Sequence, residues 1–254
     1  MKGNLLDFKT VEDSKEFSGL SDQVLRNLKD GEMVLQMFSQ SKPTISIGFD
    51  DTKAPYFDEG VKHYRSQGYQ VGIRGAGGRS VANDQGILNF SLIYKVDAFK
   101  ENPYHVFHQF IQDALKPLGL NFELGQIDGA YCPGLYDISL SGRKVAGTSS
   151  RIVQGNSLVG CYLGVNGDQE KRSKVISEFY EITQDVIRVD PNKLTTIQDA
   201  LGKEISVEEV KQLLVNQFKT MVTSLEDYDT SQISQEAINQ SIERMQVYNR
   251  NHLK

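Results

Sequence analysis

Segment 130–137 places a cysteine in a turn that leads into a strand-like run. Cys132 stands directly before Pro133 and Gly134, so its sulfur is expected to be accessible. The thiolate is the nucleophilic form of cysteine, and a nearby cation favours that form. Lys144 follows in the next strand-like run and is the candidate cation. The pair predicts covalent chemistry at a thiol. The alternative is an inert cysteine, the commoner use of this residue, beside a solvated lysine.

A two-residue turn at 141–142 between two strand-like runs predicts a β-hairpin. In that hairpin Ser139 pairs with Lys144, and Asp137 pairs with Ala146. Side chains alternate between the faces of a strand. Asp137, Ser139 and Lys144 are therefore expected on one face, with Lys144 directed toward the site.

A glycine-rich segment, 73–90, links two further strand-like runs and carries Arg74 and Arg79. Glycines such as Gly77 and Gly78 allow positive φ and a close approach of the main chain to a ligand. Guanidinium groups can hold an anionic or carbonyl-rich group with forked hydrogen bonds. The alternative is an ordinary turn with solvated charges. No Gly-Lys-Ser/Thr follows, so the segment is not a phosphate-binding P-loop.

The elements that must position these residues alternate between strand-like and helix-like runs. Strands are predicted at 33–38, 44–48, 69–73, 88–94, 136–140, 144–149 and 158–165, and helices at 21–29, 58–67, from 103, 168–180, from 207 and 234–248. Asn102 before Pro103, and Ser206 with Glu209, mark two helix starts. Interleaved helices and hairpins predict an α+β fold with a mixed or antiparallel sheet. We expect one catalytic domain over 1–254, in which 185–254 is a mainly helical extension packed on the rest.

Composition excludes several classes of function. The chain has 254 residues with a formal net charge of −5 and no basic stripe, which disfavours nucleic acid as a partner. No apolar run approaches ~18 residues, so no membrane partner is expected. The first residues lack an apolar signal region, which predicts a cytoplasmic protein with Cys132 and Cys161 as free thiols. The sequence contains no cluster of Cys and His residues that would predict a metal site, and no cofactor is expected. The oligomeric state stays open, and a monomer is compatible with the sequence.

Taken together, the two motifs resemble those of the lipoate-protein ligase and octanoyltransferase superfamily, which shares its catalytic fold with biotin protein ligases. The family pattern Arg-x-x-Gly-Gly-x-x-Val-x-x-Asp-x-Gly-x-Leu-Asn is matched by Arg74, Gly77, Gly78, Val81, Asp84, Gly86, Leu88 and Asn89. The family element Gly-(Arg/Lys)-Lys-x-x-Gly is matched by Gly142, Arg143, Lys144 and Gly147. The resemblance covers roughly residues 20 to 180 and implies the biotin/lipoate ligase-type catalytic fold.

Segment 130–137 is most similar to that of the octanoyl-[glycine cleavage H protein]:protein N-octanoyltransferases. The resemblance implies that Cys132 accepts the acyl group and that Lys144 contacts the acyl carbonyl and helps to ionise the thiol. It also implies that the loop from Arg74 to Arg79 lines an acyl tunnel. The remaining substrate-binding residues that it implies are Asp84, Asn89, Asp137 and Gly147. Many members carry arginine in place of Ile73 and glycine in place of Arg79, so the roles of the two arginines stay open.

The implied reaction moves an octanoyl or lipoyl group from a lysine of the glycine cleavage H protein to lipoyl domains of 2-oxoacid dehydrogenase complexes, without ATP. Three alternatives remain: transfer of octanoyl from acyl carrier protein, ATP-dependent lipoate ligation, and noncatalytic binding of lipoyl domains. The presence of Cys132 disfavours the ligase alternative, because ligases need no nucleophilic thiol.

Overall fold

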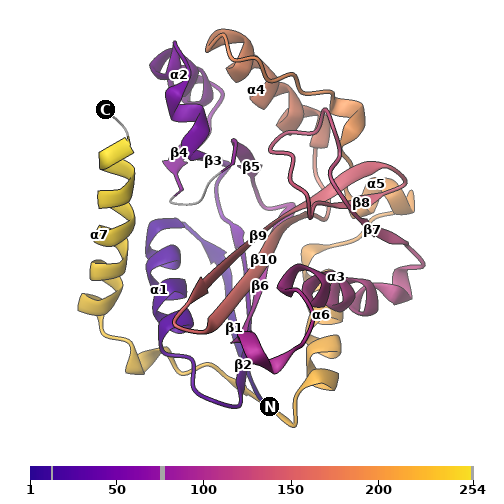
Figure 1. The fold of residues 1–254 in the computed structure, drawn as a ribbon. Coiled ribbons are helices and arrows are strands. Elements are labelled where there is room, and N and C mark those ends of the chain that lie inside the picture. Colours follow the sequence, from indigo (N-terminus) through magenta and orange to yellow (C-terminus); the bar gives the residue numbers. More distant parts are fainter. Residues whose placement is uncertain (13, 75–77, 253–254) are drawn as a thin grey trace.

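The computed structural model describes residues 1–12, 14–74 and 78–252, and its largest element is an eight-stranded sheet in the order β11-β1-β2-β6-β10-β9-β8-β7 (Figure 1). These strands are β1 Lys2–Val11, β2 Glu32–Gln40, β6 Ile87–Lys95, β7 Phe122–Leu124, β8 Ile138–Leu140, β9 Arg143–Val153, β10 Asn156–Gly164 and β11 Ser224–Asp227. β1 runs parallel to β2 and β11, whereas the other neighbours are antiparallel. The sheet is therefore mixed, and the expected α+β class is confirmed.

A second sheet of three strands, in the order β4-β3-β5, lies beside the large one (Figure 1). Its strands are β3 Thr44–Ile47, β4 Gln70–Ile73 and β5 Val81–Asn83. β4 ends where the glycine-rich loop begins, and β5 starts just after that loop. The small sheet therefore carries both ends of the loop.

Helices cover both faces of the large sheet and pack against the small one (Figure 1). The helices are α1 Ser14–Arg26, α2 Phe57–Ser66, α3 Pro103–Ala114, α4 Gln169–Ile182, α5 Ile197–Leu201, α6 Val207–Met221 and α7 Gln235–His252. Short 3-10 helices are η1 Phe49–Lys53, η2 Val96–Ala98, η3 Lys116–Leu118, η4 Pro191–Lys193 and η5 Thr230–Gln232. α3 and α6 cover one face of the large sheet, α1 and α7 belong to the other, and α2 and α4 pack on the small sheet.

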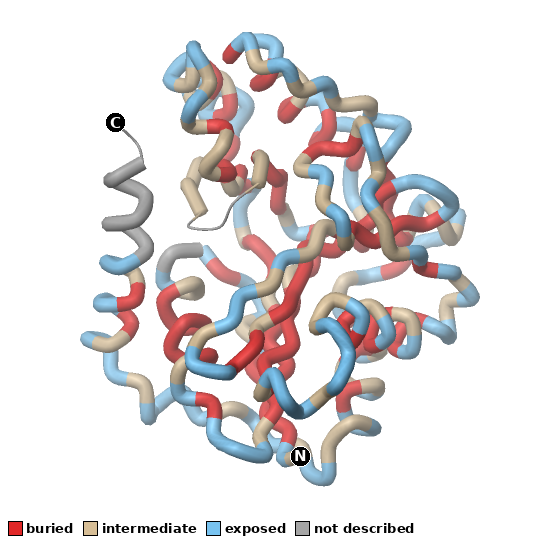
Figure 2. Tube along the Cα trace, viewed as in Figure 1, coloured by how far each residue is buried: buried red, intermediate tan, exposed pale blue. Residues whose placement is uncertain are grey.

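Alternation along β2 and β6 divides the core. Met33 and Leu35 pack toward α3 and α6, whereas Val34 between them packs toward α1. The same alternation leaves Asn89 and Ser91 of β6 on the α1 side, between core residues of the other face. Figure 2 shows the buried residues concentrated along the central strands and the helices that cover them.

Local signals in the sequence located several element ends correctly. The Asn102 side chain accepts a hydrogen bond from Tyr104 N, and Ser206 with Glu209 forms the expected capping box. Other elements differ from the prediction: α1 begins at Ser14, well before Ser21, and neither β1 nor β11 was expected. β11 extends the edge of the large sheet by pairing with β1, so the last quarter of the chain is not wholly helical. This attachment supports our proposal of one domain over 1–254.

The hairpin of β8 and β9 forms with one change of register. Ser139 lies opposite Lys144 as predicted, but Ala146 lies opposite Ile138, and the predicted Asp137–Ala146 pair was wrong. The register shift leaves Val145 as an extra residue on β9, which is the geometry of a β-bulge. Elsewhere, none of the helices formed by the described residues is long and apolar enough to cross a lipid bilayer.

Candidate functional site

Cys132 lies in the loop between β7 and β8 and has a left-handed main chain, with φ of 46°. This conformation is unfavourable for a residue with a Cβ atom and costs about 1–3 kcal/mol. Lys144 holds it in place, because its Nζ donates hydrogen bonds to the carbonyl oxygens of Tyr131, at 3.0 Å, and Cys132, at 2.6 Å. The ammonium group thus contacts the main chain of the cysteine loop.

The third partner of the Lys144 ammonium is the Asp137 carboxylate, at 2.9 Å, and both side chains are buried. Asp137 also accepts a hydrogen bond from Gly134 N at 2.9 Å, which closes the turn after Cys132. Burial raises the pKa of the Asp137 carboxyl above its ordinary value, against the stabilising effects of Lys144 and Gly134 N–H. Lysine has three N–H donors, and all three are directed at oxygen atoms of this loop.

Two N–H groups from the glycine-rich segment contact the Cys132 sulfur. Arg74 Nη2 lies 3.2 Å from Sγ, and the main-chain nitrogen of Arg79 lies 3.3 Å from it. Arg74 Nη2 also donates to the carbonyl oxygen of Arg79 at 2.7 Å. The guanidinium group carries a permanent positive charge, and both N–H groups are hydrogen-bond donors. The cation beside the sulfur is therefore Arg74, a role that the sequence analysis assigned to Lys144.

The glycine-rich loop passes very close to the sulfur at Gly78. Gly78 has a φ of +90°, and a Cβ atom there would lie 3.1 Å from Cys132 Sγ and 3.0 Å from Arg74 Nη2. Gly48, at the end of β3, allows this approach, since a Cβ atom on it would overlap the Gly78 carbonyl. Gly77, predicted to bind substrate, lies outside the described residues.

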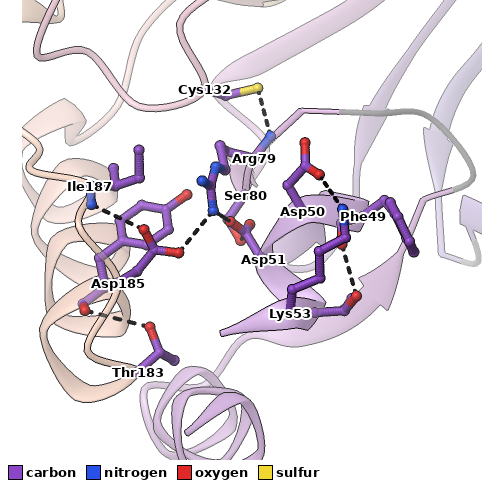
Figure 3. Close-up of polar contacts among 12 residues, drawn as sticks. Phe49, Asp50, Asp51, Lys53, Arg79, Ser80, Cys132, Thr183, Asp185 and Ile187 are labelled. Carbon is purple, nitrogen blue, oxygen red and sulfur yellow. Dashed lines mark hydrogen bonds and ion pairs between the residues drawn. The ribbon is translucent and has the colours of Figure 1, made fainter. Parts of the chain in front are cut away.

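The Arg79 guanidinium is held by carboxylates on the side away from the sulfur (Figure 3). Its Nη1 lies 3.2 Å from Asp51 and 2.9 Å from Asp185. Asp51 is completely buried and accepts a second hydrogen bond, from Ser80 Oγ, at 2.7 Å. Burial raises the pKa of the Asp51 carboxyl, against the opposing effects of Ser80 and Arg79.

A cavity of about 410 Å³ opens beside Cys132, between the large sheet, the small sheet and α1. This volume falls within the range of small-molecule sites. The predicted site residues that line it are Arg74, Gly78, Asn89, Cys132, Asp137 and Gly147. Lys144 and Arg79 instead support the cysteine from outside the cavity lining.

The base of the cavity is a row of small and polar residues across four strands. Ser91 lies opposite both Gln36 and Gly160, and Gly160 lies opposite Ser149. Gln36 Nε2 donates to Ser21 Oγ of α1 at 3.0 Å. Within the described part of the chain, Gln36 Oε1 and Ser91 Oγ are buried without a hydrogen-bond partner. These atoms could bind a polar group or water inside the cavity.

Asp84 does not line the cavity. Its carboxylate forms a two-pronged ion pair with Arg172 of α4, in which Nε lies 2.8 Å from Oδ2, and it accepts from Gly86 N at 2.9 Å. Gly147 of β9 lies opposite Tyr162, and a Cβ atom on it would overlap the tyrosine ring. Asp84 thus connects the turn between β5 and β6 to α4, while Gly147 gives the tyrosine ring space beside the cavity.

Asp51 and Asp185 were missed by the sequence analysis, because their contacts with Arg79 join residues far apart in the chain. The spacing of residues along the chain does not indicate contacts between such distant positions. Among residues 1–12, 14–74 and 78–252, no group of three or more His, Cys, Asp or Glu side chains lies together in a way that could hold a metal ion.

Comparisons with known proteins identify relatives of this chain. The chain is 37% identical over 188 residues to an octanoyl-[GcvH]:protein N-octanoyltransferase of Geobacillus kaustophilus, an alignment that covers 70% of this chain and 65% of that protein. It is 32% identical over 210 residues to a protein of the same name from Macrococcus caseolyticus, which covers 79% and 77% of the two chains.

A solved structure of lipoate-protein ligase A bound with ATP has the same fold, with a TM-score of 0.74, 18% identity, and coverage of 98% of this chain and 96% of that one. This likeness confirms the lipoate ligase-type fold. The family model for the lipoyl protein ligase A/B catalytic domain matches residues 16–219. From this match and these sequence identities we conclude that the chain belongs to the lipoyl protein ligase A/B catalytic domain family.

Proposed function

We propose that this protein transfers an octanoyl or lipoyl group from a lysine of the glycine cleavage H protein to lysines of lipoyl domains in 2-oxoacid dehydrogenase complexes. The observation that carries the proposal is the Cys132 sulfur, which faces a cavity while Arg74 and Arg79 direct N–H groups at it. The names of the two bacterial relatives support the choice of donor. Cys132 would carry the acyl group between the two proteins.

In the first step the Cys132 sulfur attacks the carbonyl carbon of the acyl-lysine amide. The C–N bond breaks, the thiol proton ends on the departing amine, and a thioester forms. In the second step the neutral amine of an acceptor lysine attacks the thioester carbon. The C–S bond breaks, and the proton lost by the amine returns to the sulfur. The covalent intermediate divides one amide exchange into two easier steps. One amide replaces another, so no ATP is needed.

Negative charge develops on the carbonyl oxygen during both steps. Preorganised donors at that oxygen lower the barrier, and removing one such donor costs roughly 2.7–4 kcal/mol. The Arg74 guanidinium and the Arg79 main-chain N–H, which already contact Sγ, are our candidates. The family resemblance implies that Lys144 contacts the acyl carbonyl. We propose a different role, because its ammonium group is bonded to Asp137 and to the carbonyl oxygens of Tyr131 and Cys132. We propose that it holds the strained main chain of the nucleophile.

The acyl chain would extend along the cavity toward the row at its base. Burial of each CH₂ contributes about 0.8 kcal/mol to binding. Of the predicted substrate-binding residues, Arg74, Gly78, Asn89, Asp137 and Gly147 would contact the acyl group or its carbonyl. Asp84 would act through its ion pair with Arg172, and Arg79 through its main chain.

The test is incubation with octanoylated H protein without ATP, followed by intact-mass measurement. We expect the mass to rise by one octanoyl group, and the adduct to disappear when a lipoyl domain is added. Cys132→Ala should abolish the adduct. The control is Cys161→Ala, which removes the other thiol. Cys161 borders the same cavity, but it packs in the core on the α3 side of the sheet, and burial raises the pKa of its thiol well above the ordinary value.

Three outcomes would point to the alternatives. An adduct that forms from octanoyl-acyl carrier protein but not from octanoylated H protein would change the donor. Transfer that requires ATP would indicate a ligase, and binding of lipoyl domains without any turnover would indicate a noncatalytic module. An adduct that persists in Cys132→Ala would overturn the thioester mechanism.

A further inference from the structure

Both hydrogen bonds to the Cys132 sulfur depend on the main chain of one residue, Arg79. Its N–H lies 3.3 Å from Sγ, and its carbonyl oxygen accepts a hydrogen bond from Arg74 Nη2 at 2.7 Å. The same Arg74 nitrogen makes the second contact with Sγ, at 3.2 Å. A shift of the Arg79 main chain would therefore disturb both donors together.

The side chain of Arg79 fixes that main chain from the opposite direction (Figure 3). Its guanidinium lies between two carboxylates from separate parts of the fold, Asp51 of η1 and Asp185 just beyond α4. The next residue, Ser80, also bonds Asp51, so Asp51 holds two consecutive residues of the loop. The Arg79 side chain is 23% exposed, and the side chains of Asp51 and Asp185 are 0% and 10% exposed, so the contacts are largely shielded from water.

Asp185 connects this arrangement to the cysteine loop as well. Its carboxylate accepts a hydrogen bond from Ile187 N at 3.1 Å, which orders the chain that follows α4. Within that segment, Asp190 N donates to the carbonyl oxygen of Gly129 at 2.8 Å, in the loop that carries Cys132. Asp185 therefore bonds Arg79 of the glycine-rich loop and also lies at the start of the segment that bonds the cysteine loop.

We infer that Asp51 and Asp185 are positioning residues for the nucleophile, which act through Arg79 to hold two N–H donors against the Cys132 sulfur. Neither carboxylate contacts the sulfur in the structure, and neither lines the cavity. The physical reason is that donors preorganised near 3 Å lose most of their effect when displaced, and a displacement of 1 Å can cost about 10²-fold in rate. The inference deepens the proposed function, because it assumes that Cys132 is the nucleophile.

The main test variant is Asp185→Asn in a Cys161→Ala background, which keeps the side-chain shape and removes the charge. The matched control is Asp50→Asn. Asp50 lies on the same 3-10 helix as Asp51, but its exposed carboxylate pairs with Lys53 at 2.9 Å (Figure 3). Two rates are measured: alkylation of Cys132 by iodoacetamide in the native protein, and transfer of octanoyl from octanoylated H protein.

In Asp185→Asn we expect alkylation and kcat to fall by roughly tenfold to a hundredfold, while KM for the donor changes by less than about threefold. Asp50→Asn should match the parent in every measurement. Alkylation at the parent rate in folded Asp185→Asn would overturn the inference, as would an equal loss in Asp50→Asn. If Asp185→Asn does not fold, Asp51→Asn replaces it with the same expectation, because its side chain can still bond Ser80.

Failure of the proposed function gives a different result. Alkylation needs no acyl donor, so slow alkylation of Asp185→Asn, combined with absence of octanoyl transfer in the parent protein, would keep the positioning role and reject the proposed substrate.

Discussion

Gly78 is the residue at which the glycine-rich loop passes close to the Cys132 sulfur. Its positive φ disfavours any residue with a Cβ, and that Cβ would lie 3.1 Å from Cys132 Sγ. For Gly78→Ala we predict a loss of stability of about 1–2 kcal/mol from the left-handed main chain. Octanoyl transfer should fall by roughly a hundredfold, because the loop must move away from the sulfur. Urea unfolding and transfer kinetics measure the two effects.

Gly119→Ala is the control for backbone strain alone. Gly119 has a similar φ, +71°, but a Cβ atom there would meet nothing within 4 Å. It should lose comparable stability and keep full transfer activity. An equal loss of transfer in both variants would mean that strain rather than the contact with sulfur explains the Gly78 result.

Lys144 is the second residue whose replacement has a defined physical effect. Lys144→Met removes the cation from the buried Asp137 carboxylate, which should lower the free energy of unfolding by about 3–5 kcal/mol near neutral pH. The native pKa of the Asp137 carboxyl is raised, so its protonated form favours the folded state. This contribution to the free energy of unfolding is complete below the unfolded pKa of 3.8 and is lost as pH rises through the native pKa. In acid the Asp137 carboxyl is protonated and no buried charge is left unpaired, so the loss of stability in Lys144→Met should become smaller. Urea unfolding at several pH values tests this.

The neighbouring Arg143 supplies the comparison for Lys144. Arg143 is exposed and lies at the hairpin turn, so Arg143→Met should change stability by no more than about 0.5 kcal/mol. A penalty for Lys144→Met that stays constant down to the acid range would argue against an unpaired Asp137 carboxylate as its cause.

At the scale of elements, α1 depends on a buried carboxylate for its contacts with α7 and β9. Asp22 of α1 is paired with Arg26 at 2.8 Å, with Arg151 of β9 at 2.8 Å and with Arg244 of α7 at 3.3 Å, and it accepts from Ser241. α1 also supplies part of the cavity wall. The placement of this wall is thus tied to the C-terminal helix.

We predict that Asp22→Asn lowers the free energy of unfolding by about 1–3 kcal/mol at neutral pH. The pKa of the Asp22 carboxyl is lowered overall. Burial alone would raise it, but the hydrogen bonds from Arg26 and Ser241 and the charge of Arg151 together have a larger effect. Its contribution is therefore present above the unfolded value of 3.8 and lost as pH falls through the native value. Unfolding curves of parent and variant should converge in acid.

Asp30→Asn is the exposed counterpart. Asp30 pairs with Lys95 at 3.1 Å but is 95% exposed, so its replacement should have almost no effect at any pH. A difference between Asp22→Asn and the parent that does not decrease in acid would contradict the ionic explanation.

At the scale of the whole molecule, the cavity exists because two sheets and a helix meet around polar positions of β2, β6, β9 and β10. Ser91 is buried at its base, opposite Gln36 and Gly160. We predict that Ser91→Leu fills this end and reduces the kcat/KM for octanoyl transfer by at least roughly tenfold, while butanoyl transfer is kept. A competition assay with butanoylated and octanoylated H protein measures the preference.

Alkylation of Cys132 by iodoacetamide provides the control for Ser91→Leu. Alkylation needs no acyl chain in the cavity, so its rate should match that of the parent. An unchanged preference for octanoyl over butanoyl, with normal alkylation, would show that the acyl chain does not extend toward Ser91.

Much of this molecule follows from interactions between near neighbours in the chain. Caps at Asn102 and Ser206 and the turn at 141–142 are local, because the partners lie within a few residues. The pairing of Ser139 with Lys144 was predictable for the same reason. The bulge at Val145 was not, since it depends on how both strands pack between β7 and β10.

The cysteine, the lysine and the glycine-rich loop were identifiable from residue type and spacing, and their family pattern predicted the fold. Their roles relative to one another depend on long-range contacts. Arg74, 58 positions from Cys132, lies beside the sulfur, and Asp185, 106 positions from Arg79, holds the loop. Lys144 instead bonds main-chain oxygens. The physical reason is that ion pairs and hydrogen bonds between distant segments depend on three-dimensional packing, which leaves no periodic mark in the sequence.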